Sequence, residues 1–252
     1  MSRSVPAILP VLAFLGALAV LLPPAGRPAD FRLFFDDFSG DLADRWIPFS
    51  FPGPRITRVR GNPPPGLDNG SAANRRGGVI SKRLFQLEPG LILKADILIS
   101  GGGGDAVFGG SLGLPRDPEA FIRGRWPEWL VGMSYDYIGR TDWSRGAIPE
   151  GGILTCSLID EDGGLEISRR PYLTRWLGSW HNFEITILQS GFVEFRLDGE
   201  LVYYSRKRIS FGYSQLPLLL GHLSGKGGKV YHDNAEVRAG RIPSGPGAGP
   251  GE

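Results

Sequence analysis

The fold of this chain is decided by residues 179–202, SWHNFEITILQSGFVEFRLDGELV. Apolar and polar residues alternate over 183–187 and again over 193–197. A period of two is typical of a strand that has one face in the core and the other in water. Gly191 and Gly199 each end a dipeptide that suits a tight hairpin turn, because such turns need positive φ. The segment therefore predicts three successive antiparallel strands.

Further strands are predicted on both sides of this segment. The stretch LILKADILI at 91–99 alternates in the same way, and KVYHDNAEV at 229–237 predicts a closing strand. Shorter strands are predicted at 108–114, 131–137 and 216–221. The 38 Gly and 21 Pro residues suit short strands joined by turns, and a hydrophobic content of 41% is enough for a core. We therefore expect one all-β domain.

Four motifs carry a family resemblance. They are D-D-F at 36–38 with a Trp at 46, the pair Trp180-His181, the pair Asp198-Gly199, and V-Y-x-D within the closing strand. In this order they resemble the concanavalin A-like lectin/glucanase superfamily, the laminin G-like jelly rolls. The resemblance implies a two-sheet antiparallel jelly-roll β-sandwich over residues 30–240.

Both ends of the chain differ from this domain in composition. Residues 1–29 contain a basic start and a mostly apolar run from 5 to 22, as a signal peptide does. The alternative is an N-terminal membrane anchor, because the run is close to the roughly 20 residues that span a bilayer. Residues 241–252 are rich in Gly and Pro and predict a disordered tail. We expect a secreted, extracytoplasmic protein, or one anchored to the membrane by its N-terminal segment.

Charge and cysteine content exclude several classes of protein. The net charge of +2 gives no reason to expect a nucleic-acid partner, or contact with a membrane except through the N-terminal segment. The basic run 206–208 is interpreted as a solvated loop. Cys156 is the only cysteine, so no intramolecular disulfide can form, and its apolar surroundings predict a buried thiol. Asn69 begins a glycosylation sequon.

The carboxylate pattern of the glucanases in this superfamily is absent. Those enzymes carry two Glu and an Asp on one strand as E-x-D-x-x-E, so that nucleophile and acid project together. The nearest stretch here runs from Asp160 to Glu166, and Gly163 and Gly164 predict a turn between the carboxylates. The sequence therefore favours a protein without catalytic activity.

Aromatic and polar residues gather between 116 and 145. Sugars stack on flat aromatic faces while planar polar side chains bind their hydroxyls, which makes this segment the candidate carbohydrate site. The alternative is that Trp126 and Trp129 cap the edge of the sandwich. The candidate ligand-binding residues are Trp126, Trp129, Tyr135, Tyr137, Arg140, Asp142 and Trp143.

The resemblance also implies a structural Ca²⁺. In many relatives the Asp of the closing strand binds the ion together with backbone carbonyls, which here places Asp233 with the carbonyls of Phe38 and Gly78. Hard oxygen ligands of this kind suit Ca²⁺. The alternative is that Asp233 and Asn234 only bond to backbone groups where the first and last strands meet.

The sequence thus predicts an exported, non-catalytic module that binds carbohydrate, such as a cell-surface glycan, or another surface partner. A first alternative is a divergent glycoside hydrolase or polysaccharide lyase with acidic residues from separate strands, for instance Asp136, Asp142 and Glu150. A second alternative is a structural or adhesive cell-surface module.

Overall fold

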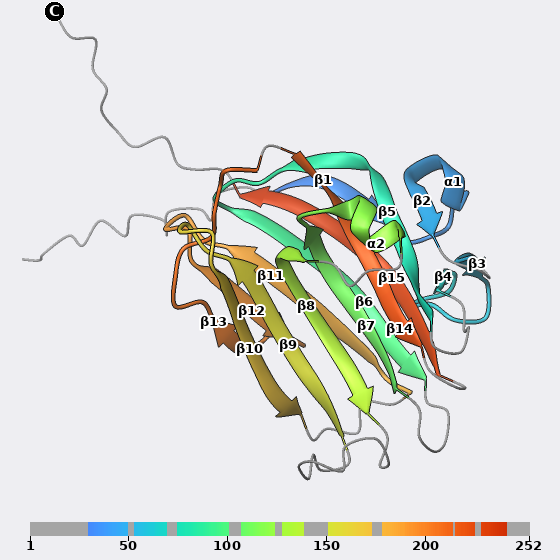
Figure 1. The fold of residues 1–252 in the computed structure, drawn as a ribbon. Helices are drawn as coiled ribbons and strands as arrows, with labels where there is room; N and C mark the ends of the chain where they lie inside the picture. The colour runs from blue at the N-terminus through green and yellow to red at the C-terminus, as the bar shows by residue number, and fades with distance from the viewer. Residues whose placement is uncertain are drawn as a thin grey trace, which may run out of the picture.

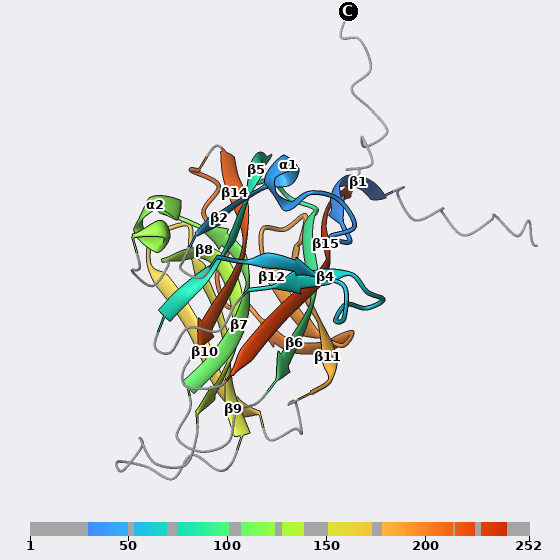
Figure 2. The ribbon, with the colours of Figure 1, turned by 90° about the vertical axis from the view of Figure 1, so that its right-hand side faces the viewer.

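The structure is a computed structural model that describes most of the chain between residues 30 and 240. Two antiparallel sheets lie face to face in it (Figure 1), and Figure 2 shows the two layers side by side. The predicted two-sheet antiparallel β-sandwich is confirmed. The described residues are 30–49, 53–69, 75–100, 107–123, 128–138, 151–172, 178–213, 215–224 and 228–240.

One layer, sheet A, has eight strands in the described part of the chain. Its order is β13-β12-β11-β6-β15-β4-β3, and β1 also pairs with β15. The bounds are β1 (Asp30–Asp36), β3 (Arg55–Thr57), β4 (Gly66–Asp68), β6 (Leu91–Ser100), β11 (Trp180–Ile187), β12 (Val193–Leu197), β13 (Glu200–Tyr204) and β15 (Lys229–Gly240).

The other layer, sheet B, has seven strands in the order β10-β9-β8-β7-β14-β5-β2. The described helices, α1 (Leu42–Arg45) and α2 (Pro118–Ile122), are short, and no described helix is long and apolar enough to cross a membrane. The strand bounds are β2 (Trp46–Phe49), β5 (Arg75–Gln86), β7 (Val107–Pro115), β8 (Trp129–Ile138), β9 (Gly151–Ile159), β10 (Leu165–Tyr172) and β14 (Gln215–Ser224).

The hairpins predicted over 179–202 form β11, β12 and β13. Phe183 pairs with Leu197 and Ile187 with Val193, as the alternation requires. The φ angles of Gly191 and Gly199 are 84° and 81°, in the left-handed region that tight turns need. The turn chemistry therefore fixes the register that sends all the apolar residues to one face.

The core lies between the facing sides of the sheets. Phe183 and Phe195 of sheet A and Met133 of sheet B are fully buried in one continuous cluster. Cys156 is part of this cluster, and burial raises the pKa of its thiol to about 12. The prediction of a buried Cys156 is confirmed, and its high pKa leaves no thiolate for nucleophilic chemistry at neutral pH.

The first and last described strands, β1 and β15, pair with each other. Phe34 lies opposite Val237, and Asp36 opposite Ala235. The Asp36 carboxylate accepts hydrogen bonds from the Trp46 indole N–H at 2.7 Å and from the backbone N–H of Phe38 at 2.8 Å. The opening motif thus has a structural role, since one buried carboxylate holds the turn that leads from sheet A towards sheet B.

Candidate functional site

The outer face of sheet B carries small side chains at its centre. Along β8, Met133 and Tyr135 belong to the core, so the alternate residues project from the opposite face. Pairing places the outward residues of β7 and β9 beside them. We call this set the β8 face; it consists of Gly109, Ser111, Gly113, Gly132, Ser134, Asp136, Ile153, Thr155 and Ser157.

Asp136 is the one carboxylate of the β8 face. It pairs with Gly109 of β7 and Ile153 of β9, and it is half-buried. A Cβ atom placed on Gly109 would lie 2.4 Å from Oδ1 of Asp136. The carboxylate therefore lies against bare backbone, and a glycine is needed beside it.

Trp129 covers the other end of the β8 face. Its side chain is 5% exposed and packs with Phe49, Ile80 and Leu219 in a second apolar cluster. A Cβ atom on Gly132 would lie 2.3 Å from the Trp129 ring. Trp129 thus packs flat on the sheet, as the edge-capping alternative describes, and little of its ring faces solvent.

The other candidate ligand-binding residues are not brought together in the described part of the chain. Tyr135 is 1% exposed and points into the core, where a Cβ atom on Gly152 would meet its ring. Tyr137 pairs with Phe108 and Gly152, but its side chain lies outside the described residues. Trp126, Arg140, Asp142, Trp143 and Glu150 also lie outside them.

The turn predicted between Asp160 and Glu166 is present, and Gly163 in it has a φ of 79°. The Asp160 carboxylate accepts backbone N–H groups of Asp162 at 3.0 Å and Gly164 at 2.8 Å. It also pairs with the Lys207 ammonium at 2.9 Å, which holds the pKa of Asp160 below its usual value. Asp160 itself is buried, with a side chain that is only 4% exposed.

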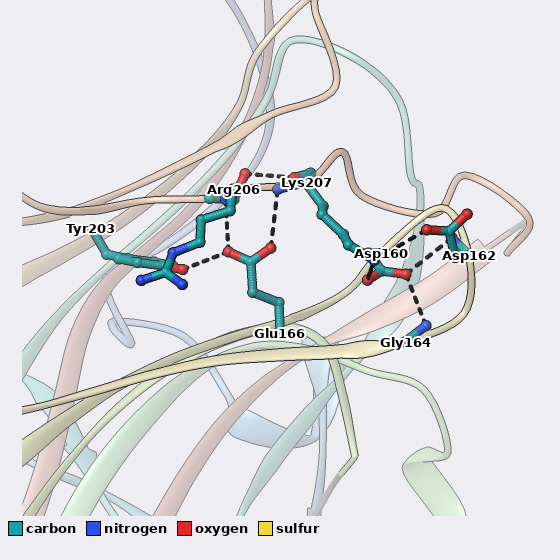
Figure 3. Close-up of polar contacts among 8 residues, drawn as sticks. Asp160, Asp162, Gly164, Glu166, Tyr203, Arg206 and Lys207 are labelled. Atoms are coloured by element: carbon teal, nitrogen blue, oxygen red, sulfur yellow. Dashed lines mark hydrogen bonds and ion pairs between the residues drawn. The ribbon is translucent and has the colours of Figure 1, made fainter.

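Glu166 is tied to the segment that follows β13 (Figure 3). Its carboxylate accepts the Tyr203 hydroxyl at 2.5 Å and the backbone N–H groups of Arg206 and Lys207 at 2.7 and 3.0 Å. Figure 3 shows that Lys207 joins the two carboxylates, because its backbone N–H bonds to Glu166 and its ammonium group to Asp160. The hydrogen bonds and the ion pair of these two carboxylates join sheet B to sheet A, so we assign both residues a structural role.

Asp233 lies in β15 opposite Asp96 of β6. Its two carboxylate oxygens accept the backbone N–H groups of Asn62 and Asn234. Burial raises the pKa of Asp233 to about 6, and the negative charges of Asp96 and Asp37 add to this rise. A cation would offset this charge, so the electrostatics of the position fit Ca²⁺.

The residues predicted to bind Ca²⁺ do not form an evident set of ligands. Gly78 belongs to β5 of sheet B, where it pairs with Gly221, and the Phe38 side chain packs in the core. The described residues contain no group of three or more His, Cys, Asp or Glu side chains that would hold a metal. Calcium therefore stays a prediction.

The described histidines have structural partners. His181 pairs through Nδ1 with Asp198 at 2.7 Å. Nδ1 of His232 lies 2.6 Å from the Asn69 amide nitrogen, which can only donate, so Nε2 carries the proton and faces the Ser111 carbonyl at 3.2 Å. Burial lowers the pKa of His232 to about 3 and that of His222 to about 4. Both side chains are neutral at physiological pH.

The alternation of residues along β8 is the sequence pattern that predicts the β8 face. Val131, Met133 and Tyr135 have the same parity, so the alternation itself places Gly132 and Asp136 on the opposite face. The role of Gly109 has no local signal, because it depends on pairing between two strands.

No family model matches this chain, and no curated protein matches it either. Solved structures do. A glycoside hydrolase family 16 endo-glucanase from Bacteroides ovatus is 13% identical, with a TM-score of 0.54, over 81% of this chain and 99% of that one. The β-glucanase of Bacillus licheniformis is 10% identical, with a TM-score of 0.52, over 83% and 98%. LamA from Z. galactanivorans, bound to laminaritriose and laminaritetraose, is 13% identical, with a TM-score of 0.51, over 82% and 98%.

These structures contradict the prediction of a non-catalytic module. The similar structures are glucan hydrolases, which leaves the alternative of a divergent glycoside hydrolase as the function to be tested. Identities of 10 to 13% establish the fold only, and the activity of this chain is a separate question. The chain has the concanavalin A-like jelly-roll fold.

Proposed function

We propose that the protein is a divergent glycoside hydrolase that acts on a β-linked glucan and uses Asp136 as one of its two carboxyl groups. The observation that carries the proposal is the position of Asp136. It projects from the outer face of β8, a central strand of sheet B, with Gly109 beside it on β7 and Ile153 beside it on β9. The similarity to glucanase structures supports the choice of substrate class.

Glycoside hydrolysis needs two carboxyl groups on either side of the scissile bond. One protonates the leaving oxygen, and the other acts as nucleophile or as base for water. A retaining pair is about 5–5.5 Å apart, and an inverting pair about 6.5–9.5 Å apart. The described part of the β8 face contributes only Asp136, and the next acidic residues along the chain, Asp142 and Glu150, are the candidates for the second carboxyl.

The small side chains around Asp136 have a consistent role in this proposal. A sugar ring can approach the strands closely only where no bulky side chain stands in the way. Ser134 and Thr155 lie opposite each other on β8 and β9. Ser134 is only 3% exposed, so the half-buried Thr155 is the one whose hydroxyl group can bond to a sugar hydroxyl. Gly109 leaves room for the Asp136 carboxylate itself. We further propose that the protein acts outside the cytoplasm, in line with its apolar N-terminal segment.

Hydrolysis by the full chain tests the proposal. Reducing-sugar release from mixed-linkage β-glucan and from laminaritetraose is expected in the wild type. In Asp136→Asn it should fall by about 100-fold or more, the usual effect of losing an acid or base group. Asp44→Asn, which alters an exposed carboxylate in α1, is the matched control and should keep full activity. An inactive wild type, or an Asp136→Asn variant of full activity, would refute the proposal.

A further inference from the structure

A groove lies at the end of the sandwich where sheets A and B are joined. Its volume is about 560 Å³. Three separate parts of the chain line it, namely the β11–β12 turn, the β9–β10 turn and the segment that follows β13. The side chains that matter for its chemistry are Glu161, Gln189, Ser190, Arg208, Ser210 and Phe211.

Main-chain hydrogen bonds fix the shape of this groove. The N–H of Ile209 donates to the Gly191 carbonyl at 2.8 Å, and that of Ser210 to the Ile159 carbonyl at 3.0 Å. The N–H of Glu161 donates to the Arg208 carbonyl at 3.0 Å. The Glu166 contacts in Figure 3 hold the start of the same segment. A ligand would therefore meet walls that are already ordered, which lowers the entropy cost of binding.

The chemistry of the walls matches a neutral sugar. Phe211 is 39% exposed, and its ring lies against Gly191, where a Cβ atom would be 3.4 Å away. The other side chains that line the groove supply one carboxylate, one guanidinium, one amide and two hydroxyls, so the charges of the lining cancel. An apolar face beside planar polar groups suits the C–H face and hydroxyls of a pyranose, and the charge balance disfavours an anionic ligand.

The groove is remote from Asp136. Asp136 pairs with Ile153 near the start of β9, whereas the groove adjoins Ile159 at its end. At about 3.3 Å per residue, the six intervening steps amount to roughly 20 Å along the strand. A glucan chain in the groove would therefore contact the protein well away from the proposed catalytic carboxyl.

We infer that this groove is a second carbohydrate-binding site, which holds a neutral glucan chain at a distance from Asp136. The inference rests on the proposed function only for the choice of glucan as ligand. A chain held at this site would raise the local concentration of the polymer around the enzyme, so the effect should be larger on a polysaccharide than on a short oligosaccharide.

The test is affinity electrophoresis of the full chain through gels that contain mixed-linkage β-glucan. An Asp136→Asn background prevents turnover, so binding is measured independently of hydrolysis. Phe211→Ala should weaken glucan binding about tenfold, on the scale of a lost aromatic contact, and Gln189→Ala severalfold. Phe31→Ala is the matched control, since Phe31 is a phenylalanine of similar exposure, 46%, outside the groove.

The outcomes separate this inference from the proposed function. Weaker binding in Phe211→Ala and Gln189→Ala, with unchanged binding in Phe31→Ala, supports the second site. Equal retardation of the groove variants and the Asp136→Asn parent, or no retardation of the parent at all, would overturn it. Absence of hydrolysis in the wild type, with groove-dependent binding intact, would refute only the proposed hydrolase activity.

Discussion

Oδ1 of Asp136 lies 2.4 Å from the position that a Cβ atom on Gly109 would occupy. The same Cβ would lie 2.3 Å from the backbone carbonyl oxygen of Tyr135. Two adjacent strands therefore approach each other at the one carboxylate of the β8 face, and the absence of a side chain on β7 makes this possible.

Gly109→Ala should for this reason damage both stability and activity. The new methyl group cannot fit unless backbone and carboxylate move, a strain of about 1–3 kcal/mol. Urea unfolding should show the loss of stability, and glucan hydrolysis should fall because Asp136 is displaced. Gly40→Ala is the control, since nothing lies within 4 Å of its Cβ position. Unfolding of Gly109→Ala at the wild-type midpoint would contradict this prediction.

Glu166→Gln should destabilise the protein without changing its chemistry. The charged carboxylate accepts two backbone N–H groups and the Tyr203 hydroxyl, and an amide cannot replace all three bonds. We expect a loss of about 1–3 kcal/mol in the free energy of unfolding, with hydrolysis per folded molecule unchanged. Glu161→Gln, in the same turn but exposed, is the stability control. Hydrolysis that disappears in folded Glu166→Gln would show that this carboxylate is catalytic.

Acid should destabilise the fold through His222 and His232. Their folded-state pKa values, about 4 and about 3, lie below 6.5, the ordinary pKa of a histidine side chain. The unfolded chain therefore binds more protons than the folded one between these values, and stability falls as the pH drops through 6.5 towards 4. Urea midpoints at pH 7.5 and pH 5 measure this slope. His222→Gln should flatten it, and an unchanged slope would assign the acid sensitivity to other groups.

Calcium should raise the melting temperature if Asp233 binds the ion. At about a hundred times its dissociation constant, Ca²⁺ would add roughly 2.7 kcal/mol to the folded state. Asp233→Ala should remove that increment, whereas Asp41→Ala, an exposed acidic residue, should keep it. Identical melting curves in chelator and in millimolar Ca²⁺ would leave Asp233 with only its backbone hydrogen bonds.

The alternation at 183–187 and 193–197 is enough to predict the hairpins of sheet A, because each apolar residue there packs into the core between the two sheets. Gly191 and Gly199, which end the two turns, indicate that the chain reverses direction there. The fold was therefore accessible from local patterns.

The site was less accessible, because its geometry depends on partners far along the chain. Asp160 is buried because Lys207 reaches it from the segment after β13. No sequence pattern near Asp160 predicts that contact. Composition groups Tyr135 with the candidate ligand-binding aromatics, whereas its parity with Met133 indicates the core, where it lies. The groove beside Phe211 combines three segments that only the folded chain brings together.

The place of β15 in sheet A has a consequence for biosynthesis. This strand pairs with β6, β4 and β1, so the middle of sheet A is filled by the described strand that is synthesised last. Until then β6 and β1 have exposed edges and no common neighbour. Sheet A can therefore close only after all its other strands have been made, and the unpaired edges of β6 and β1 are open to aggregation until β15 docks.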